Sequence, residues 1–363
     1  MKIAMITDLH FGARRGSPLI LDSQMKFYHD QFIPYLIENN IKNVFILGDT
    51  MDNRNTIDIR ILNAVIDLFK KFEDNGITIH ILIGNHDIFY KTSIETNSIK
   101  FLEKFDNVKT FADKNKILSI TSDNGTKRKI LMVPWIVNEQ EFVNDLVTNK
   151  DYEGIDICMG HFEIKGFGMY KGAVCQEGLN VNIFEMFKKV YSGHFHHRSF
   201  KKAGNTHIEY IGNPYHLTRN DIDDERGFTV LDLDDLSQVF IENTQSSKFI
   251  SVTPQDIITD DMIANNFVDI KISIDSEYDA ASEVATSNFI KRIESMKPIV
   301  SPIIKTEHVY DFKDEIENLN EQIKMMTIPQ TLNEFIKQME LTKENKKLIK
   351  EMIDEYYEKC KAE

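Results

Sequence analysis

The stretch KIAMITDLH at residues 2–10 is a run of apolar residues with an acid and a histidine close behind it. Similar apolar runs, each followed by Asp, Asn or His, return in NVFILGD at 43–49, IHILIGNHD at 79–87, IDICMGH at 155–161 and VYSGHFH at 190–196. A short run that is apolar at nearly every position is typical of a strand buried on both faces of a parallel sheet. The carboxyl ends of such strands meet at one edge of an open α/β sheet, where ligands bind. The sequence therefore predicts an α/β fold with one site at that edge.

The five strand ends carry side chains that can hold metal ions. One Asp or His after a strand is usually a turn or capping residue, but here the pattern recurs at one topological position. Mixed nitrogen and oxygen ligands without a thiolate suit Mn, Fe or Zn and disfavour a cysteine-based structural zinc site. The candidate ligands are two carboxylates, one carboxamide and four imidazoles, namely Asp8, His10, Asp49, Asn85, His161, His194 and His196.

This ligand set is large enough for two metal ions. Seven ligands are too many for one catalytic metal that keeps open positions, and they suit two metals that share a bridge. Two metals about 3.5–4 Å apart clamp the attacking and leaving oxygens of an in-line phosphoryl displacement. The set therefore predicts hydrolysis of a phosphate ester.

The composition is that of a soluble globular protein, with 42% hydrophobic and 28% charged residues among 363. No run approaches the roughly 18 apolar residues of a membrane helix. Three cysteines are too few and too scattered for a disulfide framework, so we expect a cytoplasmic protein. The net charge of −14 argues against a protein that coats nucleic acid, yet a nuclease needs only a local basic groove beside its metals.

Along the chain, the pattern predicts three parts. Residues 1–245 alternate strands with amphipathic helices, which is typical of a layered sheet, with helices at 25–39 and 59–72 and strands at 2–6, 43–47, 78–83, 130–133, 155–159, 190–192, 206–211 and 228–232. Residues 246–308 predict a small βαβ unit, with strands at 268–274 and 299–305 around a helix at 280–296. Residues 309–363 show only helical spacing, at 312–326 and 332–357, which predicts a C-terminal helical hairpin.

The five strand ends spell DxH, GD, GNHD, GH and GHxH in this order, and the set resembles that of the calcineurin-like metallophosphoesterases. Within that superfamily, the chain is most similar to the SbcD-type nucleases of double-strand-break repair. It has GNHD in place of GNHE, GNP at 212–214 followed by RGF at 226–228, and a small domain before terminal helices. The compact length resembles phage-encoded members. The resemblance implies a four-layer α/β/β/α nuclease domain over 1–245 and a DNA-binding capping domain over 246–308.

The resemblance also implies a role for each ligand. One metal would be held by Asp8, His10, Asp49 and His196. The other would be held by Asp49, Asn85, His161 and His194, so that Asp49 is the bridge. His86 would not be a ligand; it would face the scissile phosphate, to stabilise the transition state or to protonate the leaving oxygen.

Asp52 departs from the nuclease pattern, because break-repair nucleases often carry His three residues after the bridging Asp, whereas related phosphatases carry Asp. We expect the Asp52 carboxylate to hydrogen-bond His86 and keep it protonated. The alternative is a turn residue at the surface. On the first hypothesis, Asp52→Asn lowers turnover and leaves metal occupancy intact.

Basic side chains next to the ligand loops are candidates for DNA contacts. At the mouth of the site they would pair with phosphates without reading bases, although any one of them can equally be a solvated surface charge. The candidates are Arg14, Arg15, Arg54, Arg60, Lys91 and Arg198.

Together these features predict a Mn-dependent DNA nuclease, with Mg as the second candidate metal, that acts as exonuclease or endonuclease. The resemblance implies that it processes double-stranded DNA ends in recombination, repair and replication beside an SMC-like ATPase. That partner would bind the C-terminal helices, unless these fold back on the core. A homodimer would form through the nuclease domain near residues 25–39 and 59–72.

Two other interpretations stay open. One is a phosphatase or cyclic-nucleotide phosphodiesterase on the same scaffold, since Asp52 and Arg54 suit a phosphate monoester. The other is a scaffold subunit that tethers DNA without cutting it. A phage-encoded version would act in the host cytoplasm.

Overall fold

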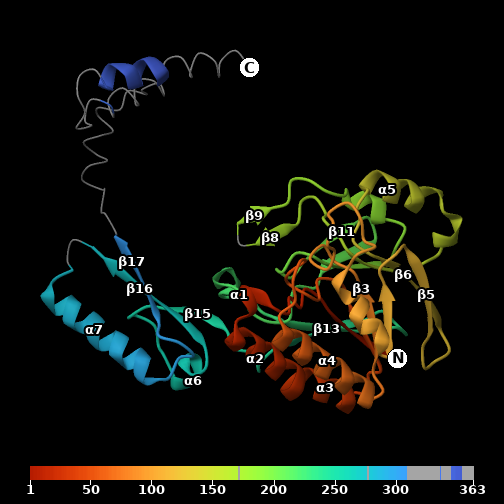
Figure 1. The fold of residues 1–363 in the computed structure, drawn as a ribbon, viewed down its shortest axis with the longest axis horizontal. Coiled ribbons are helices and arrows are strands. Elements are labelled where there is room, and N and C mark those ends of the chain that lie inside the picture. Colours follow the sequence, from red (N-terminus) through yellow and green to blue (C-terminus); the bar gives the residue numbers. More distant parts are fainter. Residues whose placement is uncertain (171, 276–277, 309–335, 337–344, 354–363) are drawn as a thin grey trace. The chain divides into compact units, whose positions relative to one another are not determined.

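The computed structural model describes residues 1–170, 172–275, 278–308, 336 and 345–353, and its main feature is a pair of six-stranded sheets (Figure 1). The first sheet has the order β14-β13-β1-β2-β3-β4. Its strands β1 to β4 are parallel, and β13 runs antiparallel to β1. The strands are β1 (Lys2–Ile6), β2 (Asn43–Ile46), β3 (Thr78–Leu82), β4 (Val108–Phe111), β13 (Gly227–Asp232) and β14 (Gln238–Glu242).

The second sheet has the order β11-β12-β10-β7-β6-β5. Its four central strands are parallel, and an antiparallel strand closes each edge. The strands are β5 (Lys116–Thr121), β6 (Lys127–Val133), β7 (Ile157–His161), β10 (Lys189–Gly193), β11 (Ser199–Ala203) and β12 (Thr206–Tyr210). The metal-capable residues thus follow, or end, parallel strands of both sheets.

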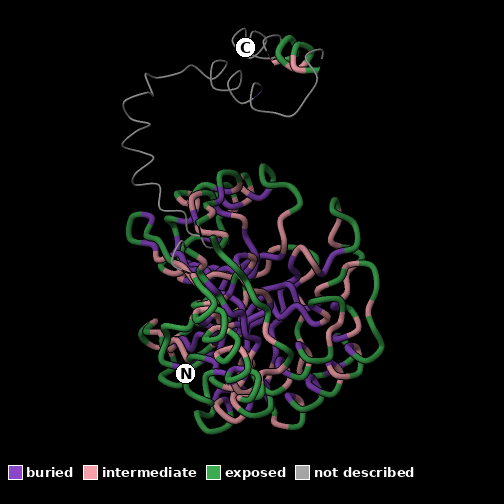
Figure 2. Tube along the Cα trace, turned by 90° about the vertical axis from the view of Figure 1, so that its left-hand side faces the viewer, coloured by how far each residue is buried: buried purple, intermediate pink, exposed green. Residues whose placement is uncertain are grey.

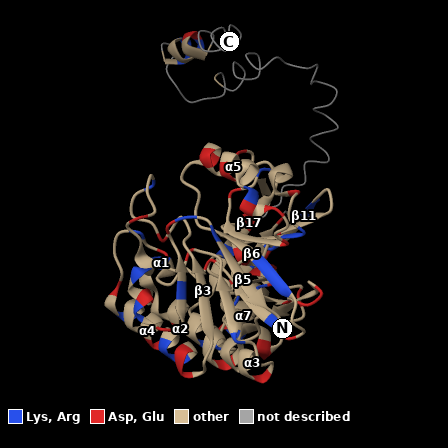
Figure 3. Cartoon of the chain, turned by 90° about the vertical axis from the view of Figure 1, so that its right-hand side faces the viewer, with Lys and Arg blue, Asp and Glu red and all other residues tan. Residues whose placement is uncertain are grey.

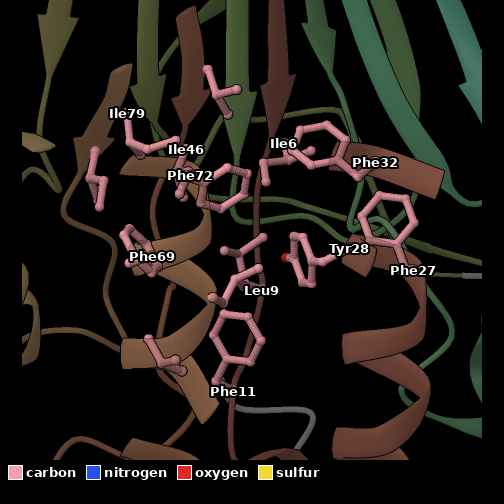
Figure 4. Close-up of a cluster of buried hydrophobic side chains, with 14 of the residues drawn as sticks. Ile6, Leu9, Phe11, Phe27, Tyr28, Phe32, Ile46, Phe69, Phe72 and Ile79 are labelled. Atoms are coloured by element: carbon pink, nitrogen blue, oxygen red, sulfur yellow. The ribbon is translucent and has the colours of Figure 1, made fainter. Parts of the chain in front are cut away.

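Alternate residues of each strand enter different cores. Met5 of β1 and Met159 of β7 lie in the core between the two sheets. Ile6, on the other face of β1, joins Phe72 and other aromatic side chains in the core under the helices (Figure 4). Figure 2 shows the buried residues concentrated inside this part of the chain. Because both faces of each central strand are covered, its sequence is apolar throughout, and the predicted α/β/β/α layering is confirmed.

Helices cover the outer face of each sheet. On the first sheet lie α2 (Pro18–Phe27), the π-helix η1 (Tyr28–Phe32), α3 (Ile33–Glu38) and α4 (Ile59–Asp74). On the second lies α5 (Glu139–Thr148). The shorter elements are α1 (Ala13–Gly16), η2 (Ser98–Lys104), η3 (Lys150–Tyr152), η4 (Val181–Phe184), η5 (Arg219–Asp221), β8 (Gly168–Tyr170) and β9 (Ala173–Val174).

The helix predicted at 25–39 is longer and less regular than expected. It begins at Pro18 and widens into the π-turn η1 just before Pro34. Proline has no N–H to donate, and its ring clashes with the carbonyl four residues earlier, here that of Asp30. A wider turn relieves that clash, and it places Tyr28 and Phe32 fully inside the core.

The second half of the chain contains a three-stranded sheet of order β15-β16-β17, formed by β15 (Phe249–Val252), β16 (Phe267–Ile274) and β17 (Ile303–His308), with α6 (Asp260–Ile263) and α7 (Ala280–Ser295). The strand predicted at 299–305 begins later, directly after Pro302, because proline cannot donate to the ladder. Contacts divide the chain into two units, Met1–Lys271 with Ser287–Lys305, and Ile272–Thr286 with Thr306–Glu363. The boundaries 1–245, 246–308 and 309–363 stay predictions.

Most of the predicted C-terminal hairpin lies outside the described residues. Of residues 309–363, the structure describes Ile336 and a helical stretch at 345–353. Within the described part of the chain, no helix has the length and apolar character needed to cross a bilayer.

Candidate metal centre

The polar residues at the ends of β1, β2, β3, β7 and β10 come together in three overlapping groups. Within each group the ligand atoms lie within 4.8 Å of one another. The groups are Asp8 with His10 and His196, His10 with Asp49 and His86, and Asp49 with His161 and His194. The structure therefore gathers at one place side chains that are up to 188 positions apart, from Asp8 to His196.

In the first group, imidazole nitrogens face carboxylate oxygens. His10 Nε2 lies 3.8 Å from Asp8 Oδ1 and 3.7 Å from Asp49 Oδ2. His196 Nε2 lies 3.7 Å from Asp8 Oδ1 and only 3.0 Å from His10 Nε2. Two imidazole nitrogens this close repel each other unless a proton or a cation lies between them, so this donor set fits a divalent metal ion.

The remaining ligands meet the same oxygen of Asp49 through His161. His161 Nε2 lies 3.4 Å from Asp49 Oδ2 and 3.0 Å from Asn85 Oδ1. His194 Nδ1 lies 2.9 Å from the same oxygen of Asn85. The four side chains fit a second divalent ion, and Asp49 contacts both sets.

Further hydrogen bonds orient the ligand side chains. His161 Nδ1 donates to the main-chain oxygen of Leu47 at 2.7 Å, which leaves its Nε2 for the site. Thr7 Oγ1 donates to Asp8 Oδ2 at 2.7 Å, and the main-chain N–H of His194 donates to the same oxygen at 3.0 Å. His86 N–H donates to Asp49 Oδ1 at 2.7 Å. Each carboxylate therefore accepts hydrogen bonds from main-chain or hydroxyl donors and also faces imidazoles.

Several ligands have left-handed backbone. The φ angles of Asp8, His10, Asp49 and His194 are 52°, 44°, 51° and 92°. Such residues cost about 1–3 kcal/mol each and persist only where the surroundings enforce them. Here the main chains brace one another: Asp8 N–H donates to Gly48 O and His10 N–H to Asp49 O, both at 3.0 Å.

Gly84 permits a close approach of two loops in the site. A Cβ at this position would collide with Asp49, lying 2.9 Å from its Cγ and nearer still to its Oδ1 and main-chain nitrogen. Real Cβ atoms do not approach this closely, so any other residue would displace the shared carboxylate.

The carboxylates of the site carry negative charge that protons on the nearby imidazoles partly neutralise. Burial opposes ionisation of Asp8, but the facing imidazoles prevail and lower its pKa to about 2; they lower the pKa of Asp49 further. Burial also opposes charge on His10, yet Asp52 and Asp8 raise its pKa to about 10. His161 behaves alike, with Asp49 raising its pKa to about 9 against burial. Divalent cations would displace these protons, so metal binding should release protons.

The other two histidines stay neutral. Burial, followed by the charge of His161, lowers the pKa of His194 to about 4. Burial, followed by the charge of His10, lowers the pKa of His196 to about 4. Neutral imidazole is the form that binds a metal, so these two ligands are ready to coordinate at neutral pH.

The predicted hydrogen bond between the Asp52 carboxylate and His86 is wrong. His86 Nδ1 instead donates to the main-chain oxygen of Asp52 at 2.8 Å. The Asp52 carboxylate lies 3.1 Å from His10 Nδ1. The loop after β2 pairs with the loop after β1, where Asp52 N–H donates to Phe11 O at 3.0 Å, so the side chain of Asp52 meets His10.

This contact changes the expected effect of Asp52→Asn. The substitution should weaken the metal held by His10 about 10- to 100-fold, because loss of an outer carboxylate partner makes a ligand imidazole less basic. Titration of Mn²⁺ against the purified protein measures this, with Asp67→Asn on the exposed side of α4 as the matched control. Unchanged Mn²⁺ affinity in Asp52→Asn would contradict a role of Asp52 in orienting His10.

Two contributors to the site were not predicted. Asp87 is fully buried, and its carboxylate accepts from Gly84 N–H at 2.9 Å and Met51 N–H at 3.1 Å, which ties the loops after β2 and β3 together. Burial and the charge of Asp49 raise the pKa of Asp87 to about 6.

Trp135, the chain's one tryptophan, lies after β6 with its ring 5.2 Å from that of His194 and 5.8 Å from that of His161. An apolar side chain at a strand end gave no signal in the sequence.

The basic side chains predicted to contact DNA differ in their exposure and in whether they already form ion pairs. Arg14 and Arg15 are exposed on α1 at φ angles of 56° and 60°. Lys91 is exposed and Arg54 half-buried. Arg60 is engaged by Asp58 at 2.7 Å. Arg198 is half-buried; it binds the buried Glu209 at 2.9 Å and stacks 4.5 Å from the ring of Phe240, so its charge is already paired within the protein. Figure 3 shows that acidic and basic residues are interspersed over the face it presents.

The fold and this cluster of ligands define a metallophosphoesterase, and the chain belongs to the calcineurin-like phosphoesterase family, which residues 1–198 match. It is similar to exonuclease subunit 1 of Enterobacteria phage T4, at 32% identity over 244 residues, which is 67% of this chain and 68% of the relative. It is also similar to DNA double-strand break repair protein Mre11 of Sulfolobus acidocaldarius, at 25% identity over 395 aligned positions, covering 99% of this chain and 96% of the relative. A solved structure of an archaeal phosphodiesterase aligns with 67% of this chain and 99% of its own, at 14% identity and a TM-score of 0.35.

Proposed function

We propose that this chain is the nuclease subunit of a DNA-end-processing complex and hydrolyses phosphodiester bonds in double-stranded DNA. The observation that carries the proposal is the meeting of two ligand sets at Asp49. The names of the relatives, an exonuclease subunit and a double-strand-break repair protein, support DNA as the substrate. Recombination, repair and replication are the processes that such an activity would serve.

The proposed roles follow the geometry. Asp8, His10 and His196 would hold one divalent ion, Asn85, His161 and His194 would hold the other, and Asp49 would serve both. When bound, two such ions supply Lewis acidity and an activated water for in-line attack on phosphorus. Nitrogen and oxygen ligands without sulfur suit Mn²⁺, with Mg²⁺ as the second candidate.

His86 has a different part in the proposal. Its ring Nδ1 donates to the main-chain oxygen of Asp52, and its main-chain N–H donates to the Asp49 carboxylate. The remaining ring nitrogen is available to a substrate phosphate. There it would stabilise negative charge on the phosphate or give a proton to the leaving oxygen.

The proposal extends to the assembly of this chain with a partner. The family resemblance and the word subunit in the phage relative's name support a partner, which we propose to be an SMC-like ATPase bound by the C-terminal helices. We also propose a homodimer through α2, α3 and α4.

One comparison of substrates tests the activity. Linear duplex DNA, a bis-ester such as bis(p-nitrophenyl) phosphate, and a phosphopeptide are incubated with the protein and Mn²⁺. Hydrolysis of DNA and the bis-ester, but not of the phosphopeptide, is expected. Preferred hydrolysis of the phosphopeptide would identify a phosphatase, and DNA binding without hydrolysis a tethering scaffold.

Arg14 and Arg15 should dominate the salt dependence of DNA binding. Each phosphate contact contributes about 0.9 to the slope of log K against log salt, so the double replacement by Ala should lower that slope by about 2. Fluorescence anisotropy of a labelled duplex at several salt concentrations measures it. Arg60→Ala is the matched control, because Asp58 already neutralises Arg60. An equal loss in both variants would contradict the assignment.

A further inference from the structure

Arg226 directly precedes β13 and has a side chain that is only 4% exposed. Its Nη1 donates to the main-chain oxygen of His196 and to Asn213 Oδ1. Its Nη2 donates to Asp221 Oδ1 at 2.7 Å and to Asp224 Oδ2 at 2.9 Å. We call Asn213, Asp221, Asp224 and Arg226 the Arg226 cluster. None of its members is a candidate metal ligand.

The Arg226 cluster fixes the main chain on one side of the metal centre. Besides Arg226, the main-chain N–H of Asn213 donates to the oxygen of His196 at 3.3 Å. The next residue, His197, donates from Nδ1 to Asp224 at 2.8 Å. Two consecutive residues, one of them a ligand of the first group, are therefore tied to the cluster.

The ligands of the other metal are held by different contacts. His194 N–H donates to the Asp8 carboxylate, and His194 Nδ1 lies 2.9 Å from Asn85. His161 donates to Leu47 O. None of these contacts involves the Arg226 cluster, so its loss should act on His196 first.

Arginine is the residue that this position requires. Its planar guanidinium presents five donors in fixed directions, which lets one side chain serve acceptors from several loops; the three donors of lysine rotate about one point. The guanidinium also neutralises the buried Asp221 and the half-buried Asp224, and removing it would leave the Asp221 carboxylate without its cationic partner.

The cluster is anchored on its far side as well. Arg219 Nε donates to the buried carboxylate of Asp269 in β16 at 2.8 Å. The N–H of Phe249 in β15 donates to His216 Nδ1 at 3.1 Å, and His216 Nε2 donates to Asp224 O at 3.0 Å. The segment 212–226 is thus supported by the small sheet while it holds His196.

We propose that Arg226 is a positioning residue that sets His196 for one of the two metal ions and leaves the other site unaffected. The inference rests on the proposed two-metal function. Arg226 acts through the main chain of His196, without any contact to substrate.

The test resolves the two metals separately. Total Mn²⁺ bound is followed by the electron paramagnetic resonance signal of free Mn²⁺. Binding of Mn²⁺ to His161 and His194 is followed by quenching of the fluorescence of Trp135, whose ring lies beside those of the two histidines. Arg226→Lys keeps the positive charge but loses the planar guanidinium with its fixed donor directions. In this variant, one Mn²⁺ should bind about 10- to 100-fold more weakly. The midpoint of Trp135 quenching should stay unchanged. Arg226→Met should have the same effect, and the lysine variant carries the test if the methionine variant does not fold.

A matched control is Arg128→Met. Arg128 also has a mostly buried guanidinium, which donates to Leu233 O at 2.7 Å and binds Asp156 at 2.8 Å, but it touches no candidate ligand. Arg128→Met should leave the affinity for both Mn²⁺ ions unchanged. Equal weakening of both steps in Arg226→Lys, or no change in either, would overturn the inference. Failure of the unmodified protein to bind two Mn²⁺ would instead contradict the proposed function.

Discussion

Asp49→Asn is expected to abolish tight binding of both metal ions and to lower DNA hydrolysis about 10³-fold or more. The carboxylate faces His10 at 3.7 Å and His161 at 3.4 Å, so its charge serves both ligand sets. A bound metal supplies several kcal/mol of transition-state stabilisation, and each 1.36 kcal/mol is tenfold in rate. Mn²⁺ stoichiometry and the rate of release of nucleotides from a linear duplex measure the two effects.

The control for this variant is Asp67→Asn, an identical change on the exposed side of α4. It should retain two Mn²⁺ per chain and full turnover. Retention of both ions by Asp49→Asn would contradict the bridging role, even if hydrolysis fell.

His86→Gln is expected to lower kcat for DNA about 10²- to 10⁴-fold, the range typical of a lost general acid. Both metal ions should remain bound, because the seven other side chains supply the two ligand sets. Turnover at saturating Mn²⁺, together with the number of Mn²⁺ bound, separates catalysis from metal binding.

His86 also lies in the group with His10 and Asp49, and its ring is 4.8 Å from that of His10. Loss of one Mn²⁺ in His86→Gln would therefore identify His86 as a ligand. His29→Gln, at an exposed position of η1, controls for the change from His to Gln.

The sequence predicted that these side chains meet, because they follow strands that are buried on both faces. Runs such as that of β2 are apolar throughout, and the convergence of parallel strand ends then places Asp8, Asp49 and His161 together without knowledge of any loop. The prediction needed only the order of strands and their ends. It did not depend on the exact path of the chain.

Features that depend on the path of a loop were not predictable. Proximity of residue 52 to His86 was anticipated, but the atom involved was not, since it depends on which way the loop after β2 turns. The edge strands β5 and β11 are partly exposed and polar, so their sequences lack the apolar runs. Arg226 contacts His196 across 30 positions, and such a long-range contact has no local signature.

The left-handed backbone at four ligands restricts how this centre can evolve or be redesigned. Asn, Asp and His enter that conformation far more readily than other side chains, and β-branched residues hardly do so. Apart from glycine, the positions of Asp8, His10, Asp49 and His194 therefore accept few replacements, and these offer oxygen or nitrogen donors. Selection for a thiophilic metal such as cadmium would have to rebuild the loops before it could exchange the donors.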